Sequence, residues 1–230
     1  CSSLLFNSNT LFIFSSILNG WTIVILFTLY IFLNCIENFL SEIIWSYKRW
    51  SNSSNNLTPN HQNILFFSKT EKYTFNKIYT EYSETTNVDQ ILQKRSRDAY
   101  GKAIYARETD GSVVSSDEKK GVPLADVWEI PFVVEHSQEQ SGYDTQKPVE
   151  LLGRIIDAST NEGDLVADFF VGSGTTAIAA EGWRTRKEGD KTIYFNNSKP
   201  RRWLGCDLGK VSIQAVRAQL VKYDAKPFLI

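Results

Sequence analysis

The sequence contains no methionine, and its first 36 residues contain no charged side chain. All 25 basic and 26 acidic residues lie beyond that point, and no proline occurs before Pro59. From the missing methionine we expect that a natural start is absent. Such an abrupt change in composition is unusual inside one domain of this length, so residues 1–36 are treated separately from residues 37–230.

Cysteine, histidine and net charge are also scarce. The three cysteines, at positions 1, 35 and 206, are an odd number and so do not form a disulfide framework. We therefore expect a reducing, cytoplasmic location. His61 and His136 have no metal-ligand spacing with any cysteine, so we expect no metal site. A net charge of −1 gives no overall footprint for nucleic acid, so DNA binding would need a local basic patch.

The uncharged segment allows three interpretations. Residues 11–36 are long and apolar enough to span a bilayer. However, polar residues interrupt the first half, and no Lys or Arg precedes it to set an orientation. The segment could instead be a buried apolar part of the fold, or non-native sequence such as a frame-shifted translation. We favour non-native sequence over a membrane helix, because a different composition begins immediately afterwards.

The most informative stretch is residues 165–176, Leu-Val-Ala-Asp-Phe-Phe-Val-Gly-Ser-Gly-Thr-Thr. An apolar run ends in Asp168, a Gly-Ser-Gly turn follows, and a helix-forming segment comes next. Gly172 and Gly174 permit a sharp turn and a close approach by a ligand. The following helix directs free N–H groups at that ligand. This order predicts a nucleotide-type cofactor site.

Three cofactor classes use this arrangement. A phosphate-binding P-loop requires lysine after its glycines, but Thr175 follows Gly174. A dinucleotide fingerprint is satisfied by Gly172, Gly174 and Ala177, yet its ribose-binding acid belongs about 20 residues later, well before Asp207. For S-adenosylmethionine, an acid at 168 would face the cationic methionine moiety and Asp207 would bind the ribose hydroxyls. A nicotinamide or flavin enzyme remains the alternative.

Five stretches, in order, resemble the DNA amino-methyltransferase family. They are Asn38–Trp45 and His61–Lys69, similar to the middle strands; Thr145–Pro148, similar to the segment before the cofactor motif; Asp168–Thr176, similar to that motif; and Arg201–Leu208, similar to the second cofactor strand. With the cofactor motif late in the chain, the order resembles the circularly permuted group. The resemblance implies a Rossmann-like α/β domain with a mostly parallel sheet and S-adenosylmethionine as cofactor. It also implies DNA as partner, with methylation at N6 of adenine or N4 of cytosine and a place in restriction-modification.

The resemblance also implies a set of cofactor-binding residues. They are Lys147, Asp168, Phe170, Gly172, Ser173, Gly174, Thr175 and Asp207. Each has a simpler alternative. Asp168 could instead be a charge partner at the N-terminus of the following helix, and Asp207 could cap the N-terminus of the next helix. Phe170 would equally fill the core, and Lys147 would equally be solvated.

The family's catalytic tetrapeptide, of the Asp-Pro-Pro-Tyr type, is absent. An exocyclic base amine is a poor nucleophile, so its hydrogens need acceptors and the flipped base needs an aromatic partner. We therefore assign no catalytic residue, and we expect an inactive fragment whose fold is incomplete at the N-terminus. A decayed, non-enzymatic cofactor-binding fragment is a further alternative. A homodimer or a restriction-system partner stays open.

Periodicity predicts the elements of residues 37–230. Strands are expected at 43–47, 64–67 and 127–130, and helices at 88–97, 149–156 and 213–220. Residues 70–125 form a variable polar region with little core, and residues 145–220 form the cofactor-binding half. Within that half, residues 182–200 are a polar insertion that a compact βαβ unit does not need.

Overall fold

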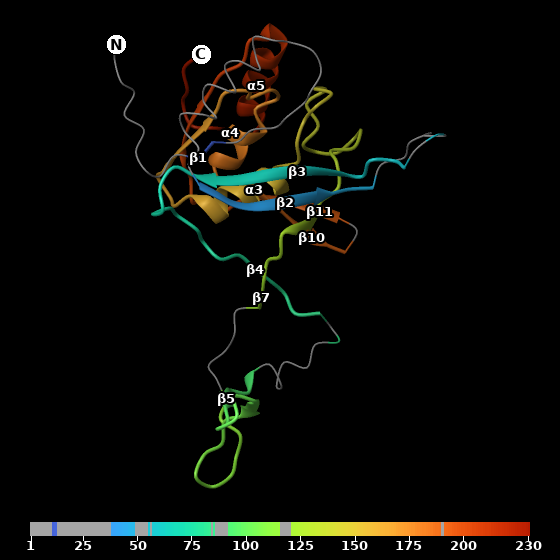
Figure 1. Ribbon diagram of the computed structural model, residues 1–230. Helices are drawn as coiled ribbons and strands as arrows, with labels where there is room; N and C mark the ends of the chain where they lie inside the picture. The colour runs from blue at the N-terminus through green and yellow to red at the C-terminus, as the bar shows by residue number, and fades with distance from the viewer. Residues whose placement is uncertain are drawn as a thin grey trace. The chain divides into compact units, whose positions relative to one another are not determined.

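The computed structural model describes residues 11–12, 38–48, 55, 57–83, 85, 92–115, 121–189 and 191–230. It divides the chain into two compact units (Figure 1). The larger unit combines residues 1–76 with residues 125–230, and the smaller unit is residues 77–124. The larger unit has an α/β fold and contains every residue predicted to bind a cofactor.

A parallel sheet lies at the centre of the cofactor-binding half. Its strands are β1 (Leu11–Phe12), β9 (Leu165–Asp168) and β12 (Arg202–Gly205), in the order β1-β9-β12. Both outer strands run parallel to β9, in which Val166 and Ala167 are fully buried. Parallel strands that are covered on both faces consist of apolar residues without alternation, as Leu-Val-Ala does here.

The position of β1 changes one expectation. The composition of residues 1–36 also predicts an apolar helix or an ill-packed appendage rather than a strand of the sheet, but Leu11 pairs with Val166 and Phe12 pairs with Ala167. The expectation is wrong at these two residues, because an uncharged apolar stretch suits the inside of a parallel sheet. The rest of the segment lies outside the described residues, so the choice among its three interpretations stays open.

A second sheet has the order β3-β2-β8. Strand β2 (Asn38–Ser46) pairs antiparallel with β3 (His61–Ser68) and parallel with β8 (Val127–Glu129). These bounds confirm the three predicted strands. Trp45 anchors the sheet, because its buried indole donates a hydrogen bond to the carbonyl of Ile130 at 2.8 Å.

Three helices lie in the part of the larger unit that the structure describes. They are α3 (Val149–Ser159), α4 (Thr175–Ala180) and α5 (Lys210–Lys222). The predicted stripes at 149–156 and 213–220 therefore do form helices. Their apolar faces meet in one buried cluster, made of Val149, Val171, Ala177, Ile178, Val216, Leu220 and Tyr223. The helices and the central strands thus pack around the cofactor motif.

The polar insertion is a hairpin, which the sequence analysis did not predict. Strand β10 (Trp183–Glu188) pairs antiparallel with β11 (Lys191–Asn196) over its whole length. The chain leaves and returns at one place, since Asn197 N–H donates to the Gly182 carbonyl at 2.9 Å.

The smaller unit consists of short strands: β4 (Tyr79–Thr80), β5 (Arg95–Arg97), β6 (Ala103–Tyr105) and β7 (Val122–Pro123). None of its described residues is buried, as expected for a polar region with little core. Strand β4 pairs with β7, and β5 pairs with β6.

The helix expected at 88–97 is wrong at its C-terminal end, where Arg95–Arg97 forms β5. The cause is a tight turn next to it. One carboxylate oxygen of Asp98 accepts the N–H groups of Tyr100 and Lys102, both at 2.9 Å. Gly101 adopts a φ of +79°, which favours glycine, so the chain reverses into a hairpin.

One carboxylate of α3 binds both strand β10 of the insertion and the residue that precedes β12. Asp157 receives two hydrogen bonds from Arg184 of β10, at 2.7 and 2.6 Å, and one contact from Arg201 at 3.2 Å. Both arginines are buried, whereas the Asp157 side chain is about one-third exposed. Two buried cations therefore share one ion-pair partner.

We predict that Asp157→Asn destabilises the chain by about 2 to 3 kcal/mol, since it removes the ion-pair partner of two buried guanidinium groups. Urea unfolding measures this cost. Glu150→Gln is the matched control, because Glu150 pairs only with Arg154 in a partly exposed i,i+4 bridge. It should cost about 0.5 kcal/mol or less. Equal costs for the two variants would contradict the prediction.

Candidate functional site

The predicted cofactor residues meet at the carboxyl ends of β9 and β12. Asp168 ends β9 and lies opposite Gly205, which ends β12. The turns that follow are bonded to each other, since Cys206 N–H donates to the Asp168 carbonyl and Val171 N–H donates to the Cys206 carbonyl, both at 3.0 Å. The carboxyl edge of parallel strands is where α/β proteins bind ligands.

Asp168 organises the first turn from inside the protein. One carboxylate oxygen accepts Phe170 N–H at 3.0 Å, and the other accepts the Thr176 hydroxyl at 2.6 Å. The residue is only 7% exposed. Burial raises the pKa of this carboxyl above its usual range, although the two hydrogen bonds oppose the shift. Proximity to Asp207 adds to the rise.

The two glycines of the turn lie against different side chains. Gly172 has a φ of +51°, and a Cβ there would lie 3.4 Å from Cε1 of Tyr143. Gly174 has a φ of +86° and forms the N-cap of α4, and a Cβ there would lie 3.1 Å from Cα of Val216. Glycine is needed at 174 for close packing against α5, and at 172 for a turn that an aromatic ring covers.

Asp207 joins the two turns. One carboxylate oxygen accepts Gly172 N–H at 3.0 Å, and the other accepts Gly209 N–H at 2.8 Å. The side chain therefore combines an Asx-type contact in its own turn with a contact across the site. This half-buried carboxylate holds the Gly172 turn against the loop that enters α5.

The remaining residues of the motif lie at the start of α4. The hydroxyls of Ser173 and Thr175 are buried and lie 3.1 Å apart. Phe170 is 36% exposed and does not belong to the core cluster. The simpler alternative had placed this side chain in the core. Its ring is accessible beside the turn.

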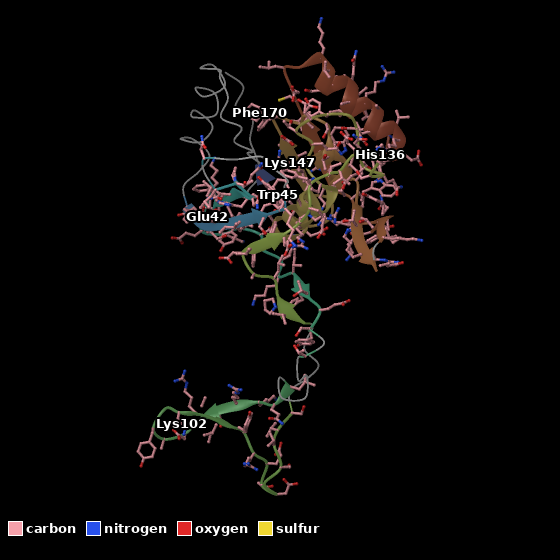
Figure 2. The ribbon with its side chains drawn as sticks, turned by 90° about the vertical axis from the view of Figure 1, so that its right-hand side faces the viewer. Glu42, Trp45, Lys102, His136, Lys147 and Phe170 are labelled. Carbon is pink, nitrogen blue, oxygen red and sulfur yellow. The ribbon has the colours of Figure 1, made fainter. Side chains whose placement is uncertain are left out.

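Lys147 comes from the loop before α3, and Figure 2 shows it together with Phe170 in the larger unit. Its ammonium donates to the Thr145 carbonyl at 3.1 Å. Burial lowers the pKa of this lysine below its usual range. Lys147 is thus not a fully solvated charge, which was the simpler alternative.

Sequence reasoning missed Glu139. This buried carboxylate accepts the N–H of Val149, the first residue of α3, at 2.8 Å. Burial raises the pKa of Glu139, and the bond from Val149 opposes the rise. One signal was available: Pro148, the N-cap residue, has no side-chain acceptor, so the free N–H groups of α3 needed a partner from elsewhere.

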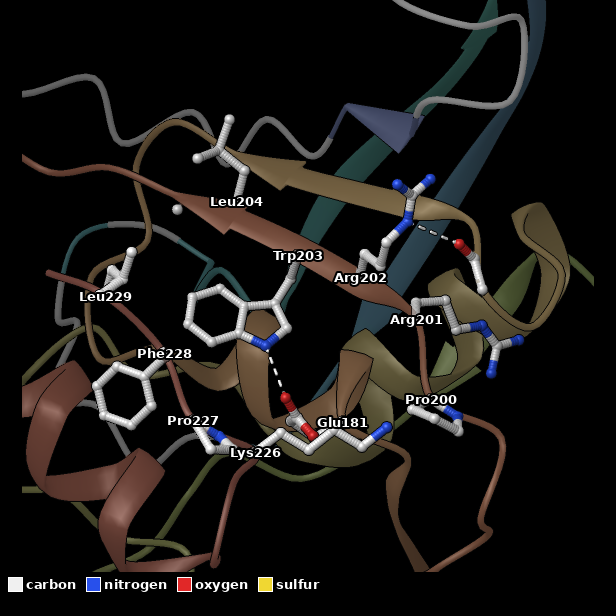
Figure 3. Close-up of a pocket in the computed structure, with 12 residues that line it drawn as sticks. Glu181, Pro200, Arg201, Arg202, Trp203, Leu204, Lys226, Pro227, Phe228 and Leu229 are labelled. Carbon is white, nitrogen blue, oxygen red and sulfur yellow. Dashed lines mark hydrogen bonds between the residues drawn. The ribbon is translucent and has the colours of Figure 1, made fainter.

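A pocket of about 580 Å³ lies beside β12, separate from the Gly172 turn (Figure 3). Its lining includes Trp203 and Phe228, whose ring centroids are 6.3 Å apart. The Trp203 indole donates to a Glu181 carboxylate oxygen at 2.9 Å. None of the predicted cofactor residues lines this pocket.

Within the part of the chain that the structure describes, no group of three or more His, Cys, Asp or Glu side chains is arranged to hold a metal ion. No described helix combines the length and apolar character needed to cross a membrane.

A sequence model of the DNA methylase family, the N6/N4 type, matches residues 3–217. The chain therefore belongs to this family. The match begins within the uncharged segment and extends into α5, so it includes all three described sheets of the larger unit and the whole smaller unit.

Individual relatives agree with the family. The Type II methyltransferase M.BamHI of Bacillus amyloliquefaciens is 30% identical over 195 residues, which are 85% of this chain and 39% of the relative. M.HpaI of Haemophilus parainfluenzae is 33% identical over 138 residues, 60% of this chain and 36% of the relative. The chain thus spans less than half of either relative. The M1.HpyAVI–SAM complex has 18% identity and a TM-score of 0.48, over 88% of this chain and 71% of that chain.

We predict that Glu139→Gln gains stability relative to the unchanged chain as the pH rises. The raised pKa means that the folded chain binds this proton more tightly than the unfolded chain does. The contribution of Glu139 is therefore complete below about 4.5, its ordinary pKa, and declines as the pH passes the higher folded value. Glutamine does not titrate and keeps an acceptor for Val149.

Urea unfolding of both proteins from about pH 4 to about pH 7 tests this, because linkage predicts a growing difference in unfolding free energy. Glu129→Gln, at an exposed position, is the control and should show a flat difference. A flat difference for Glu139→Gln as well would contradict the assignment of its raised pKa to burial.

Proposed function

We propose that the turn between β9 and α4 binds S-adenosylmethionine, and that the intact protein methylates an exocyclic amine of adenine or cytosine in DNA. The observation that carries this proposal is the convergence of Asp168 and Asp207 on the Gly172 turn, in a chain that belongs to the DNA methylase family. Both acids lie at the carboxyl edge of parallel strands, where α/β folds bind cofactors.

The residues present fit such a cofactor. When bound, S-adenosylmethionine supplies a methyl group activated by a sulfonium. The buried carboxyl of Asp168 has a raised pKa, and a nearby cation would favour its charged form. The half-buried carboxylate of Asp207 is available for ribose hydroxyls, which donate hydrogen bonds, and Phe170 offers an accessible ring beside the turn.

DNA binding at a net charge of −1 would need a local excess of basic side chains, and such an excess occurs in residues 92–115, although residues 77–124 as a whole carry eight basic and eight acidic residues. The described hairpins of the smaller unit carry more basic than acidic side chains. The basic residues are Lys94, Arg95, Arg97, Lys102 and Arg107, against Asp98, Glu108 and Asp110. These side chains lie on short, mostly exposed strands and turns, where phosphate contacts would supply affinity.

The alternative within the same family is a cofactor-binding chain without activity. The sequence has no tetrapeptide of the Asp-Pro-Pro-Tyr type. Holding the two substrates together contributes several kcal/mol. The amine must also lose a proton as the methyl group arrives, and no described residue is assigned to accept it.

We predict that Gly172→Val weakens binding of S-adenosylhomocysteine, the product form of the cofactor, by at least about tenfold, because valine is strained at positive φ and crowds the turn. Isothermal titration calorimetry, with NAD as the competing ligand class, measures this. Gly101→Val is the control: its φ is +79°, yet a Cβ there would meet no heavy atom within 4 Å. Equal affinities in the Gly172 variant and the unchanged chain would contradict the assignment, as would a preference for NAD.

We also predict that this chain transfers no methyl group to DNA, even where it binds S-adenosylhomocysteine. Purified protein is incubated with labelled S-adenosylmethionine and unmethylated genomic DNA, and acid-insoluble label is counted. A sample without protein sets the background. Label above that background would show that acceptors for the amine hydrogens exist in the chain.

A further inference from the structure

We infer that Tyr143 is a positioning residue of the cofactor site: its ring packs on the Gly172 turn, its hydroxyl is bonded to Ser212 of α5, and together these contacts hold the 137–147 loop on the site. The nature of the ligand rests on the proposed function. The contacts themselves belong to the chain without any ligand.

The ring of Tyr143 lies against the Gly172 turn. A Cβ at 172 would lie 3.4 Å from Cε1 and 4.0 Å from Cζ of Tyr143, which is ordinary van der Waals contact, so it is the φ of +51° that favours glycine there. The ring therefore covers the face of the turn toward which a side chain at 172 would point. A ligand that approaches this turn must accommodate the ring as well as the backbone.

The hydroxyl contact fixes the ring from the other end. Tyr143 Oη lies 3.0 Å from Oγ of Ser212, which is 69 residues away in the sequence. Ser212 is only 3% exposed and lies in the first turn of α5. Breaking this part-buried bond from the Tyr143 side is costly, because the buried Ser212 hydroxyl then loses its partner.

These contacts close a ring of interactions around the site. Oγ of Ser212 lies 2.9 Å from the position that a Cβ of Gly209 would take. Gly209 N–H is bonded to Asp207, and Asp207 also accepts Gly172 N–H. Tyr143 then returns from the Gly172 turn to Ser212. The loop before α3 is thereby tied to both turns that carry the predicted cofactor residues.

The loop that carries Tyr143 is internally braced. Ser141 donates its N–H and its hydroxyl to Oε1 of Gln146, at 2.8 and 2.6 Å. Gln146 N–H donates to the Tyr143 carbonyl at 3.1 Å, and its amide nitrogen donates to the Glu139 carbonyl at 2.6 Å. Because these bonds make the loop move as a unit, the contacts of Tyr143 with the Gly172 turn and with Ser212 also determine where Lys147 lies relative to Asp207.

The test uses Tyr143→Phe, Ser212→Ala and the double variant in the full chain. Tyr100→Phe is the control, because Tyr100 is 95% exposed and belongs to the smaller unit. Amide hydrogen exchange is measured without ligand. Each single variant should exchange about three- to tenfold faster at residues 137–147 and 172–174, as expected for loss of one hydrogen bond. The double variant should be no faster than the faster single variant, because both remove the same bond.

Calorimetry with S-adenosylhomocysteine gives the second measurement, and each single variant should bind about three- to tenfold more weakly. Slow amides in α3 should not change, which distinguishes positioning from general destabilisation. Unchanged exchange in Tyr143→Phe, additive effects in the double variant, faster exchange throughout α3, or unchanged affinity would overturn the inference. Faster local exchange in a chain that binds no S-adenosylhomocysteine at all would support the role of Tyr143 in positioning the loop. It would also refute the proposed cofactor.

Discussion

The two hydrogen bonds that Asp207 accepts from backbone N–H groups are the interaction on which the site depends. One comes from the Gly172 turn and the other from Gly209, so a single side chain sets the separation of the loops after β9 and β12. The parallel pairing of the two strands brings the loops to one edge of the sheet. The Asp207 carboxylate then fixes the two loops relative to each other. The hydrogen bonds of Asp168 and the contacts of Tyr143 further hold the Gly172 turn in this position.

Local sequence signals predicted the parts of the fold whose causes are local. The apolar stripe of α3 follows helical spacing, and the glycines at 172 and 174 occupy positive φ as the turn required. Hairpin β10–β11 was missed, because its residues are mostly polar and its pairing depends on where the chain re-enters β12. The wrong helix at Arg95–Arg97 has a similar origin, since a tight turn at Asp98 outweighed the periodicity used to predict the helix.

The site shows the same division. The predicted residues from 168 to 175 come together because strand, turn and helix follow each other closely in the chain, and Asp207 joins them because β12 pairs parallel with β9. Glu139 and Tyr143 could not be found in this way. Their partners, Val149 and Ser212, are 10 and 69 residues away, and only the folded chain brings the atoms within bonding distance. Residues that hold a site together often lack the motif that its ligand-facing residues carry.

The closed base of hairpin β10–β11 has a consequence for where this chain can be lengthened. The chain leaves α4 at Gly182 and returns at Asn197, where a backbone hydrogen bond closes the loop, and Arg201 N–H then bonds to the Ala180 carbonyl. The first and last residues of the hairpin therefore lie next to each other, while the turn at Gly189 lies at the far end. Length added at that tip changes neither the register of β12 on β9 nor the Gly172 turn. The Gly189 tip, away from Arg184 and its bonds to Asp157, is thus a place where a fluorescent or affinity tag can be inserted without rebuilding the cofactor half.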